Sequence, residues 1–202
     1  MNNQVTLATT LAGVLIVSVM SSVSTWAQDA PGHPSVSGAD GPPDAPAFVY
    51  PRIREHGKVV RLPNAIEQPR TGSRICVDVT AGGPFEEVNP AIEKVARFVN
   101  IYAGAGRKPA DVRITVVLHG DATLTALSTG AYAAKFKLDG NPNLPLFRAL
   151  KEAGVEILVC GQAISHKGVS HDDISDTVGV AVSALTVNVN RQMDGYAFVP
   201  LH

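Results

Sequence analysis

The chain has 202 residues, of which 45% are apolar and 17% charged, and 17 Lys and Arg nearly balance 18 Asp and Glu. This length suits one folded domain. A net charge of −1 excludes the broad basic surface of a general nucleic-acid binder. The two cysteines exclude a disulfide-rich scaffold and a four-cysteine zinc site.

The N-terminal segment, residues 1–27, contains no charged side chain and is predicted to be a signal peptide. Its apolar run, Val5 to Met20, is followed by small residues at Thr25 and Ala27. Cleavage after Ala27 would give a periplasmic or secreted protein with no stable membrane span. The alternative is an uncleaved membrane anchor, but the strongly apolar part is well short of the ~20 residues that a spanning helix needs.

Two further segments precede the regular pattern. Residues 28–47 are rich in Pro and Gly and lack Leu, Ile, Phe and Met, so we expect a disordered spacer. Residues 48–73 contain three Xaa-Pro pairs, which favour extended backbone. Lys58 to Leu62 is typical of a short edge strand. We therefore expect residues 48–73 to form an extended arm that packs on the domain.

The remaining segment, residues 74–202, alternates strand and helix patterns. The predicted strands cover residues 74–80, 112–118, 155–159, 178–182 and 196–201. The predicted helices run from the Asn89 cap to Gly104, from Ala122 to Phe136, from Pro145 to Gly154, from a short capping sequence at Ser170, and from the Ser183 cap to Gly195.

The strands are nearly continuous apolar runs, which indicates a parallel sheet covered on both faces. We therefore predict an α/β fold, a three-layer α/β/α sandwich of the flavodoxin-like type with a mainly parallel five-stranded sheet. In the second predicted helix, Leu124, Leu127, Ala131 and Ala134 form the expected buried stripe. In the last helix, Leu185, Val189 and Met193 lie on one face.

Reactive groups in such sheets lie at the carboxyl ends of the strands, where Cys160 ends the third predicted strand. Gly161 follows, so the thiol can face a crevice; the alternative is a buried, inert cysteine. A reactive thiolate needs a helix N-terminus or a nearby cation, which the backbone after Gly161, His166 or His119 could supply. Cys76 lies mid-strand, roughly 10 Å below that edge, so we expect a core residue and no disulfide with Cys160.

The other polar candidates are weaker. His119 follows the second strand as a general base or hydrogen-bond donor, the alternative being a histidine bonded to backbone. Asp121 fits the cap of the following helix better than a catalytic acid. His166 and His171 lack the fourth ligand that a closed zinc site with Cys160 would need, so we expect no metal. Nucleotide-binding glycine motifs are absent, so we expect no cofactor.

Several stretches resemble the DsrE/DsrF-like family of sulfur-relay proteins. They are Val117-Leu118-His119-Gly120-Asp121, residues 143–150, the run from Ala153 to Gln162 that holds the strand-end cysteine, residues 180–186 and Gly195-Tyr196-Ala197. The likeness covers about residues 74–201. It implies a flavodoxin-like fold, assembly as a homo-oligomer, and a persulfide sulfur carried on Cys160.

Two functional hypotheses follow. In the first, an exported DsrE-like protein uses Cys160 as a persulfide carrier or redox-active thiol, with His119, Asp121, Gly161, Gln162 and His166 around it. Its partners would be sulfur-donor, sulfur-acceptor or thiol proteins, and it would be a transferase-like carrier rather than a classical enzyme. In the second, the chain is a non-catalytic, oligomeric binding or assembly module in which Cys160 is structural.

Overall fold

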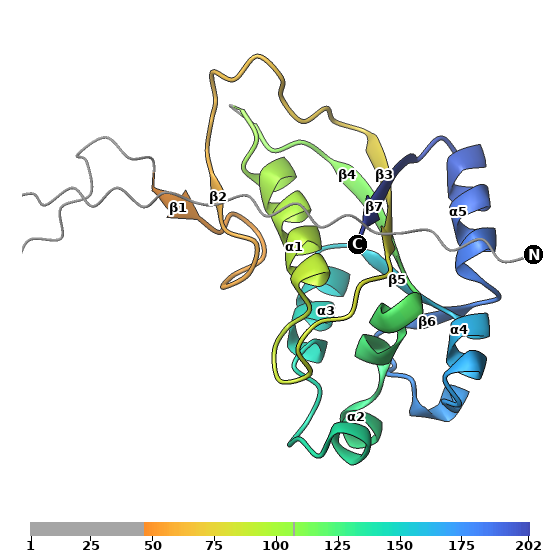
Figure 1. Cartoon of the computed structure of the whole chain (residues 1–202). Coiled ribbons are helices and arrows are strands. Elements are labelled where there is room, and N and C mark those ends of the chain that lie inside the picture. The colour runs from red at the N-terminus through yellow and green to blue at the C-terminus, as the bar shows by residue number, and fades with distance from the viewer. Residues whose placement is uncertain (1–46, 107) are drawn as a thin grey trace, which may run out of the picture. The chain divides into compact units, whose positions relative to one another are not determined.

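The computed structural model describes residues 47–106 and 108–202 (Figure 1). The predicted signal peptide, and the predicted spacer up to residue 46, lie outside the described residues. No helix in the described ranges combines the length and the apolar character needed to cross a bilayer.

The central feature is a parallel five-stranded sheet in the order β6-β5-β4-β3-β7. Its strands are β3 (Ser73–Val79), β4 (Val112–Leu118), β5 (Glu156–Cys160), β6 (Gly179–Ala181) and β7 (Ala197–Leu201). The inner strands β3, β4 and β5 are almost wholly buried, as their unbroken apolar runs predict. The predicted α/β fold with a mainly parallel five-stranded sheet is confirmed.

Helices cover both faces of the sheet (Figure 1). On one face lie α1 (Pro90–Ala103) and α3 (Leu144–Glu152), which share the main core with alternate residues of β3, β4 and β5. On the other face, α5 (Ala184–Met193) forms a smaller core with Val117 and Cys160. The short helix α4 (Gly161–His166) starts directly at the carboxyl end of β5.

The predicted helix from Ala122 to Phe136 is wrong as a single element. Residues Gly120–Ala126 form a 3₁₀ helix, and α2 spans only Thr129–Phe136. The chain breaks at Leu127 because Ser128 caps α2, its hydroxyl oxygen accepting a hydrogen bond from the N–H of Ala131. Tyr132, rather than Ala131 or Ala134, is the buried residue of α2.

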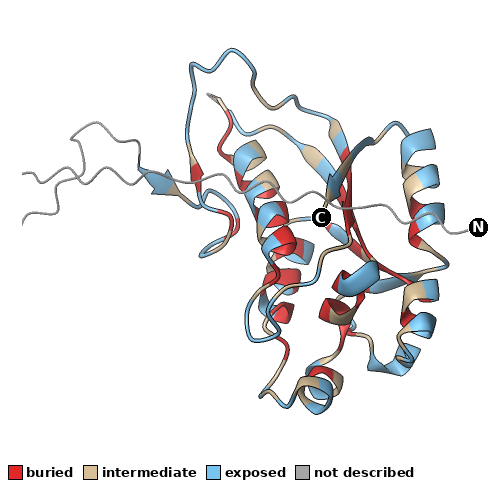
Figure 2. Cartoon of the chain, in the orientation of Figure 1, coloured by how far each residue is buried: buried red, intermediate tan, exposed pale blue. Residues whose placement is uncertain are grey.

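Helix α5 turns its apolar stripe away from the sheet. Leu185, Val189 and Met193 are 78%, 55% and 81% exposed, and Figure 2 shows the exposed outer side of α5 in pale blue. The side chains directed at the sheet include Asn188 and Arg191, because this face of the sheet carries Asp78, Thr115 and Glu156 as hydrogen-bonding partners. The side of α5 that packs on the sheet is therefore the one whose polar side chains hydrogen-bond with the polar residues of the sheet.

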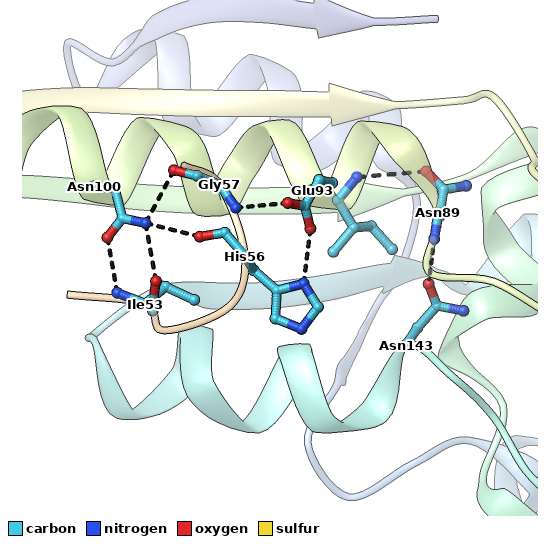
Figure 3. Close-up of polar contacts among 8 residues, drawn as sticks. Ile53, His56, Gly57, Asn89, Glu93, Asn100 and Asn143 are labelled. Atoms are coloured by element: carbon cyan, nitrogen blue, oxygen red, sulfur yellow. Dashed lines mark hydrogen bonds and ion pairs between the residues drawn. The ribbon is translucent and has the colours of Figure 1, made fainter. Parts of the chain in front are cut away.

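The segment before the sheet lies along α1. Its strands β1 (Phe48–Val49) and β2 (Val59–Val60) pair antiparallel. The buried side chain of Asn100 accepts hydrogen bonds from the N–H groups of Arg52 and Ile53. Its amide also donates to three backbone carbonyls of this segment (Figure 3): those of Ile53, His56 and Gly57.

Glu93 of α1 forms a second clamp on this segment (Figure 3). Its carboxylate accepts the N–H of Gly57 at 2.6 Å and lies 2.8 Å from Nδ1 of His56. Gly57 has φ of +62°, and a Cβ there would lie 2.2 Å from the backbone nitrogen of Arg97. Only glycine fits this close approach between segment and helix.

Candidate functional site

The sheet register brings Cys160 and His119 to the same edge. Leu118 of β4 pairs with Val159 of β5, so the next residues on the two strands are His119 and Cys160. Val79 of β3 pairs with Leu118 in the same way, which places Thr80 beyond it. Parallel strands thus align these residues in one row at their carboxyl ends.

Cys160 is the N-cap of α4, a role that the sequence analysis did not assign. Its Sγ accepts a hydrogen bond from the backbone N–H of Ala163 at 3.4 Å. A backbone donor of this kind at a helix start stabilises negative charge on sulfur. The residue is only 6% exposed and packs with Val117, Ala184 and Val187. The sulfur therefore accepts one backbone hydrogen bond but has little open access within one chain.

The two residues after Cys160 fix α4 against the edge strand β6. A Cβ on Gly161 would lie 2.9 Å from the carbonyl oxygen of Ala181, so the helix start touches β6 directly. Gln162 donates from Nε2 to the carbonyl of Val182 at 3.3 Å. Both residues therefore contact the backbone near Cys160, and the amide of Gln162 donates to Val182, the residue after β6.

His119 is held by Asp78, a residue that the sequence analysis missed. Nε2 of His119 lies 2.9 Å from Oδ1 of Asp78, and Asn188 of α5 donates to the same oxygen at 2.9 Å. Asp78 is 6% exposed. A single acidic residue inside the apolar run of β3 was the available signal, because a buried carboxylate needs partners.

Cys76 lies at the inner end of this polar network. Its thiol donates to Oδ1 of Asn188 at 3.5 Å, and the residue is fully buried. Burial and, to a smaller extent, the negative charge of Asp78 raise the pKa of the Cys76 thiol to about 11. Its thiolate is therefore scarce at neutral pH. Both cysteines are free, and Cys76 is the core residue that its mid-strand position predicts.

Asp121 and His166 do not join the thiol. Asp121 was expected to cap the following helix, which is wrong, because the cap position belongs to His119 and no side chain caps that turn. Its exposed carboxylate instead pairs with Lys167, with Nζ 3.0 Å from Oδ1. His166 is an exposed residue in the last turn of α4. Lys167, at the C-terminal end of α4, thus links this helix to the 3₁₀ helix after β4.

The described part of the chain shows no candidate metal site. Within residues 47–106 and 108–202, no group of three or more His, Cys, Asp or Glu side chains gathers in an arrangement that could hold an ion.

A family model matches more than half of this chain. The model of the DsrE/DsrF-like family matches residues 77–201, a range that includes Asp78, His119 and Cys160 but not the segment before β3. No curated protein matches.

Two solved structures are similar in arrangement. The first is a protein of unknown function, MTH1491 from Methanobacterium thermoautotrophicum, with 19% identity, coverage of 64% of this chain and 99% of that chain, and a TM-score of 0.48. The second is the ychN protein from E. coli, with 13% identity, coverage of 63% and 99%, and a TM-score of 0.43.

Proposed function

This chain belongs to the DsrE/DsrF-like family, and we propose that it handles sulfane sulfur by carrying it as a persulfide on Cys160. The observation that supports this most directly is the position of the sulfur. Sγ of Cys160 caps α4, receives the N–H of Ala163, and stands at the carboxyl edge beside His119. Cys76 is a poor competitor because its pKa is raised to about 11.

The proposed step is a thiol–persulfide exchange. The Cys160 thiolate attacks the terminal sulfur of a donor persulfide, R–S–SH. The Sγ–S bond forms, the S–S bond of the donor breaks, and the donor leaves as a thiolate. The persulfide proton passes to the released donor, and no external oxidant or reductant is needed. An acceptor thiolate then takes the sulfur by the same exchange in the opposite sense.

His119 is proposed to exchange the proton in this step. Asp78 and Asn188 hold its ring from one side through the shared Oδ1. Because Cys160 is nearly covered, the donor has to approach along the carboxyl edge, past His119, or shift the start of α5. This predicts a slow reaction with bulky reagents and a faster one with small donors.

Mass spectrometry tests the proposal. The native protein is treated with a low-molecular-weight persulfide and digested, and a gain of one sulfur atom is expected on the peptide that contains Cys160. Cys160→Ser should lose the gain, whereas Cys76→Ser, the matched control, should keep it. Iodoacetamide should likewise label Cys160 far faster than Cys76. Equal resistance of both thiols, or sulfur on Cys76 alone, would overturn the proposal.

A second proposal concerns assembly. Val182, Leu185, Val189 and Met193 are exposed around the outer side of α5, and solvent-facing apolar clusters of this kind mark interfaces. We propose that this surface packs on a second copy of the chain. The double variant Leu185→Ser with Met193→Ser should sediment as a smaller species, whereas Cys160→Ser should not. An unchanged mass for the double variant would exclude this surface.

Export is proposed from residues 1–27. A chain produced with its own N-terminus should be recovered outside the cytoplasm with Gln28 as its first residue. An uncleaved chain in the membrane fraction would support the anchor alternative instead. In an oxidising compartment, the low exposure of Cys160 would slow its conversion to sulfenic acid or a mixed disulfide.

A further inference from the structure

A groove lies between the N-terminal segment and α1, on the face of the sheet opposite α5. It encloses about 590 Å³ and is lined chiefly by apolar residues, among them Phe48, Val60, Leu62, Ile101 and Ala105. Ligand sites in proteins commonly have volumes of ~300–1,000 Å³, mainly apolar walls and a few polar groups. The groove meets this description.

The groove walls are fixed before any ligand arrives. Asn100 and Glu93 tie residues 52–57 to α1 through hydrogen bonds (Figure 3), and Gly57 brings the two backbones into contact. Further along, the guanidinium of Arg61 donates from Nε to the carbonyl of Gly104 at 3.3 Å. A preformed wall lowers the ordering entropy that a bound ligand would otherwise cost.

The charged groups of the groove favour an anion. Lys58 and Arg97 both line it, and neither forms an ion pair with any residue that the structure describes. Nζ of Lys58 lies 4.9 Å from the ring centroid of Phe48, which keeps the ammonium over an apolar surface. Glu67 is the one acidic lining residue, so the two cations leave the groove lining with an excess of positive charge.

We propose that this groove binds a small amphiphilic anion, a molecule with an apolar chain and a single carboxylate or similar head group. The chain would lie along Val60, Leu62 and Ile101, and the head group would meet Lys58 and Arg97. The groove is built largely from residues 48–69, which lie outside the family match at 77–201. It is separate from Cys160, so the two proposals fail independently.

Calorimetric titration of the full chain tests this inference. Dodecanoate, kept below its micelle concentration, should bind saturably with one molecule per chain. Dodecanol should bind about fivefold more weakly, since two ion pairs with the exposed Lys58 and Arg97 would be lost. Dodecyltrimethylammonium should bind more weakly still. The double variant Lys58→Gln with Arg97→Gln should bring dodecanoate down to the affinity of dodecanol. Lys94→Gln, an exposed cation on the same helix outside the groove, should have no effect.

A substitution in the wall of the groove distinguishes specific from non-specific binding. Ile101 is 39% exposed, so Ile101→Glu should leave the melting temperature close to that of the parent chain while placing a negative charge in the groove. Loss of dodecanoate binding in this variant supports the inference. The inference is overturned by unsaturable binding, by equal binding of the three probes, by an unchanged affinity in Ile101→Glu, or by binding to phosphatidylglycerol vesicles without binding to free dodecanoate.

Discussion

The imidazole of His119, the residue after β4, faces the carboxylate of Asp78 on β3, with Nε2 2.9 Å from Oδ1. Asn188 of α5 donates a hydrogen bond to the same oxygen, so the carboxylate on β3 is held both by α5 and by the residue after β4. Nδ1 of His119 has no hydrogen bond with the described residues and is the ring nitrogen available to an incoming group. The pair therefore fixes the His119 ring at the carboxyl end of β4, the strand next to the one that Cys160 ends.

A double-mutant cycle measures this coupling. The side chains of His119 and Asp78 are 28% and 9% exposed, so solvent screens their interaction only in part. For His119→Ala and Asp78→Ala, we expect a coupling free energy of roughly 1–2 kcal/mol in urea unfolding. The control is the pair Lys167 and Asp121, in which the carboxylate is 79% exposed. Its coupling should stay below about 1 kcal/mol. Equal coupling in the two cycles would mean that burial of Asp78 adds nothing.

Cys76 should make the stability of the chain depend on alkaline pH. Its pKa is about 11 in the folded chain, against an ordinary value of 9.0. The folded state therefore holds this proton more tightly than the unfolded state. The stability that this proton provides is complete below pH 9.0 and is lost as the pH rises through about 11. Over that window the free energy of unfolding should fall by up to ~1.4 kcal/mol per pH unit.

The measurement compares unfolding of the parent chain and of Cys76→Ala between these pH values. Tyrosine and lysine groups titrate in both proteins, so the difference between the two slopes isolates Cys76. A slope unchanged by Cys76→Ala would show that the thiol has no such effect. In the Cys160→Ser background, iodoacetamide labelling should also rise steeply only near pH 11.

Gly57→Ala should detach the N-terminal segment from α1. The new methyl group would lie 2.2 Å from the nitrogen of Arg97, at a backbone φ of +62°. We expect a loss of at least ~2 kcal/mol, since strain and a steric clash add. Gly72→Ala is the matched control, because Gly72 has φ of +82° and open space around its Cβ position. That variant should cost only the strain, about 1 kcal/mol.

Limited proteolysis gives a second measurement on these two variants. Cleavage within residues 47–70 should accelerate in Gly57→Ala and stay near the parent rate in Gly72→Ala. If both variants were cleaved equally fast, the close contact with α1 would not be what holds the segment.

Gly161→Ala should change the surroundings of Cys160 while leaving the cysteine side chain itself in place. The added Cβ would meet the carbonyl oxygen of Ala181 at 2.9 Å, which has to push α4 away from β6. We expect a destabilisation of about 1–3 kcal/mol and slower persulfide loading. Gly130→Ala, at the start of α2 with open space around it, should be neutral or stabilising by up to ~1 kcal/mol. Unchanged loading in Gly161→Ala would show that the position of α4 does not govern the thiol.

The sequence predicted the sheet well because its strands are apolar runs bounded by clear caps. Asn89 before Pro90 and Ser183 before Ala184 both cap helices as expected. Periodicity grouped Leu185, Val189 and Met193 on one face of α5, but it did not show that this face points outward while polar side chains meet Asp78 and Glu156. Which stripe packs inward depends on the polar content of the opposing sheet face, which a single helix sequence does not contain.

The sequence was enough to predict which candidate residues lie at the carboxyl ends of the strands. Cys160 and His119 follow strands whose register is set by the parallel sheet, so their neighbourhood could be inferred. The partners Asp78 and Asn188 come from β3 and α5, far apart in the chain, and no local pattern links them. The backbone after Gly161 was considered as a helix N-terminus, but the helix itself was not predicted, because residues 161–166 form only a short helix whose cap is a cysteine rather than Ser, Thr, Asp or Asn.

The two strands that pair with β3, the strand that carries Cys76 and Asp78, lie at very different distances from it in the sequence. β4 follows β3 after α1 alone, whereas β7 follows only after β4, β5, β6 and the helices between them, α5 included. Pairing across such a long stretch of sequence is slow to form. Until α5 docks, Cys76 and Asp78 lack their contacts with Asn188, and Cys160 lacks the cover of Ala184 and Val187. The thiol that is inert in the finished protein is therefore also at risk of oxidation during folding, and in the Cys160→Ser background the refolding yield should depend on a reductant in a way that Cys76→Ala abolishes.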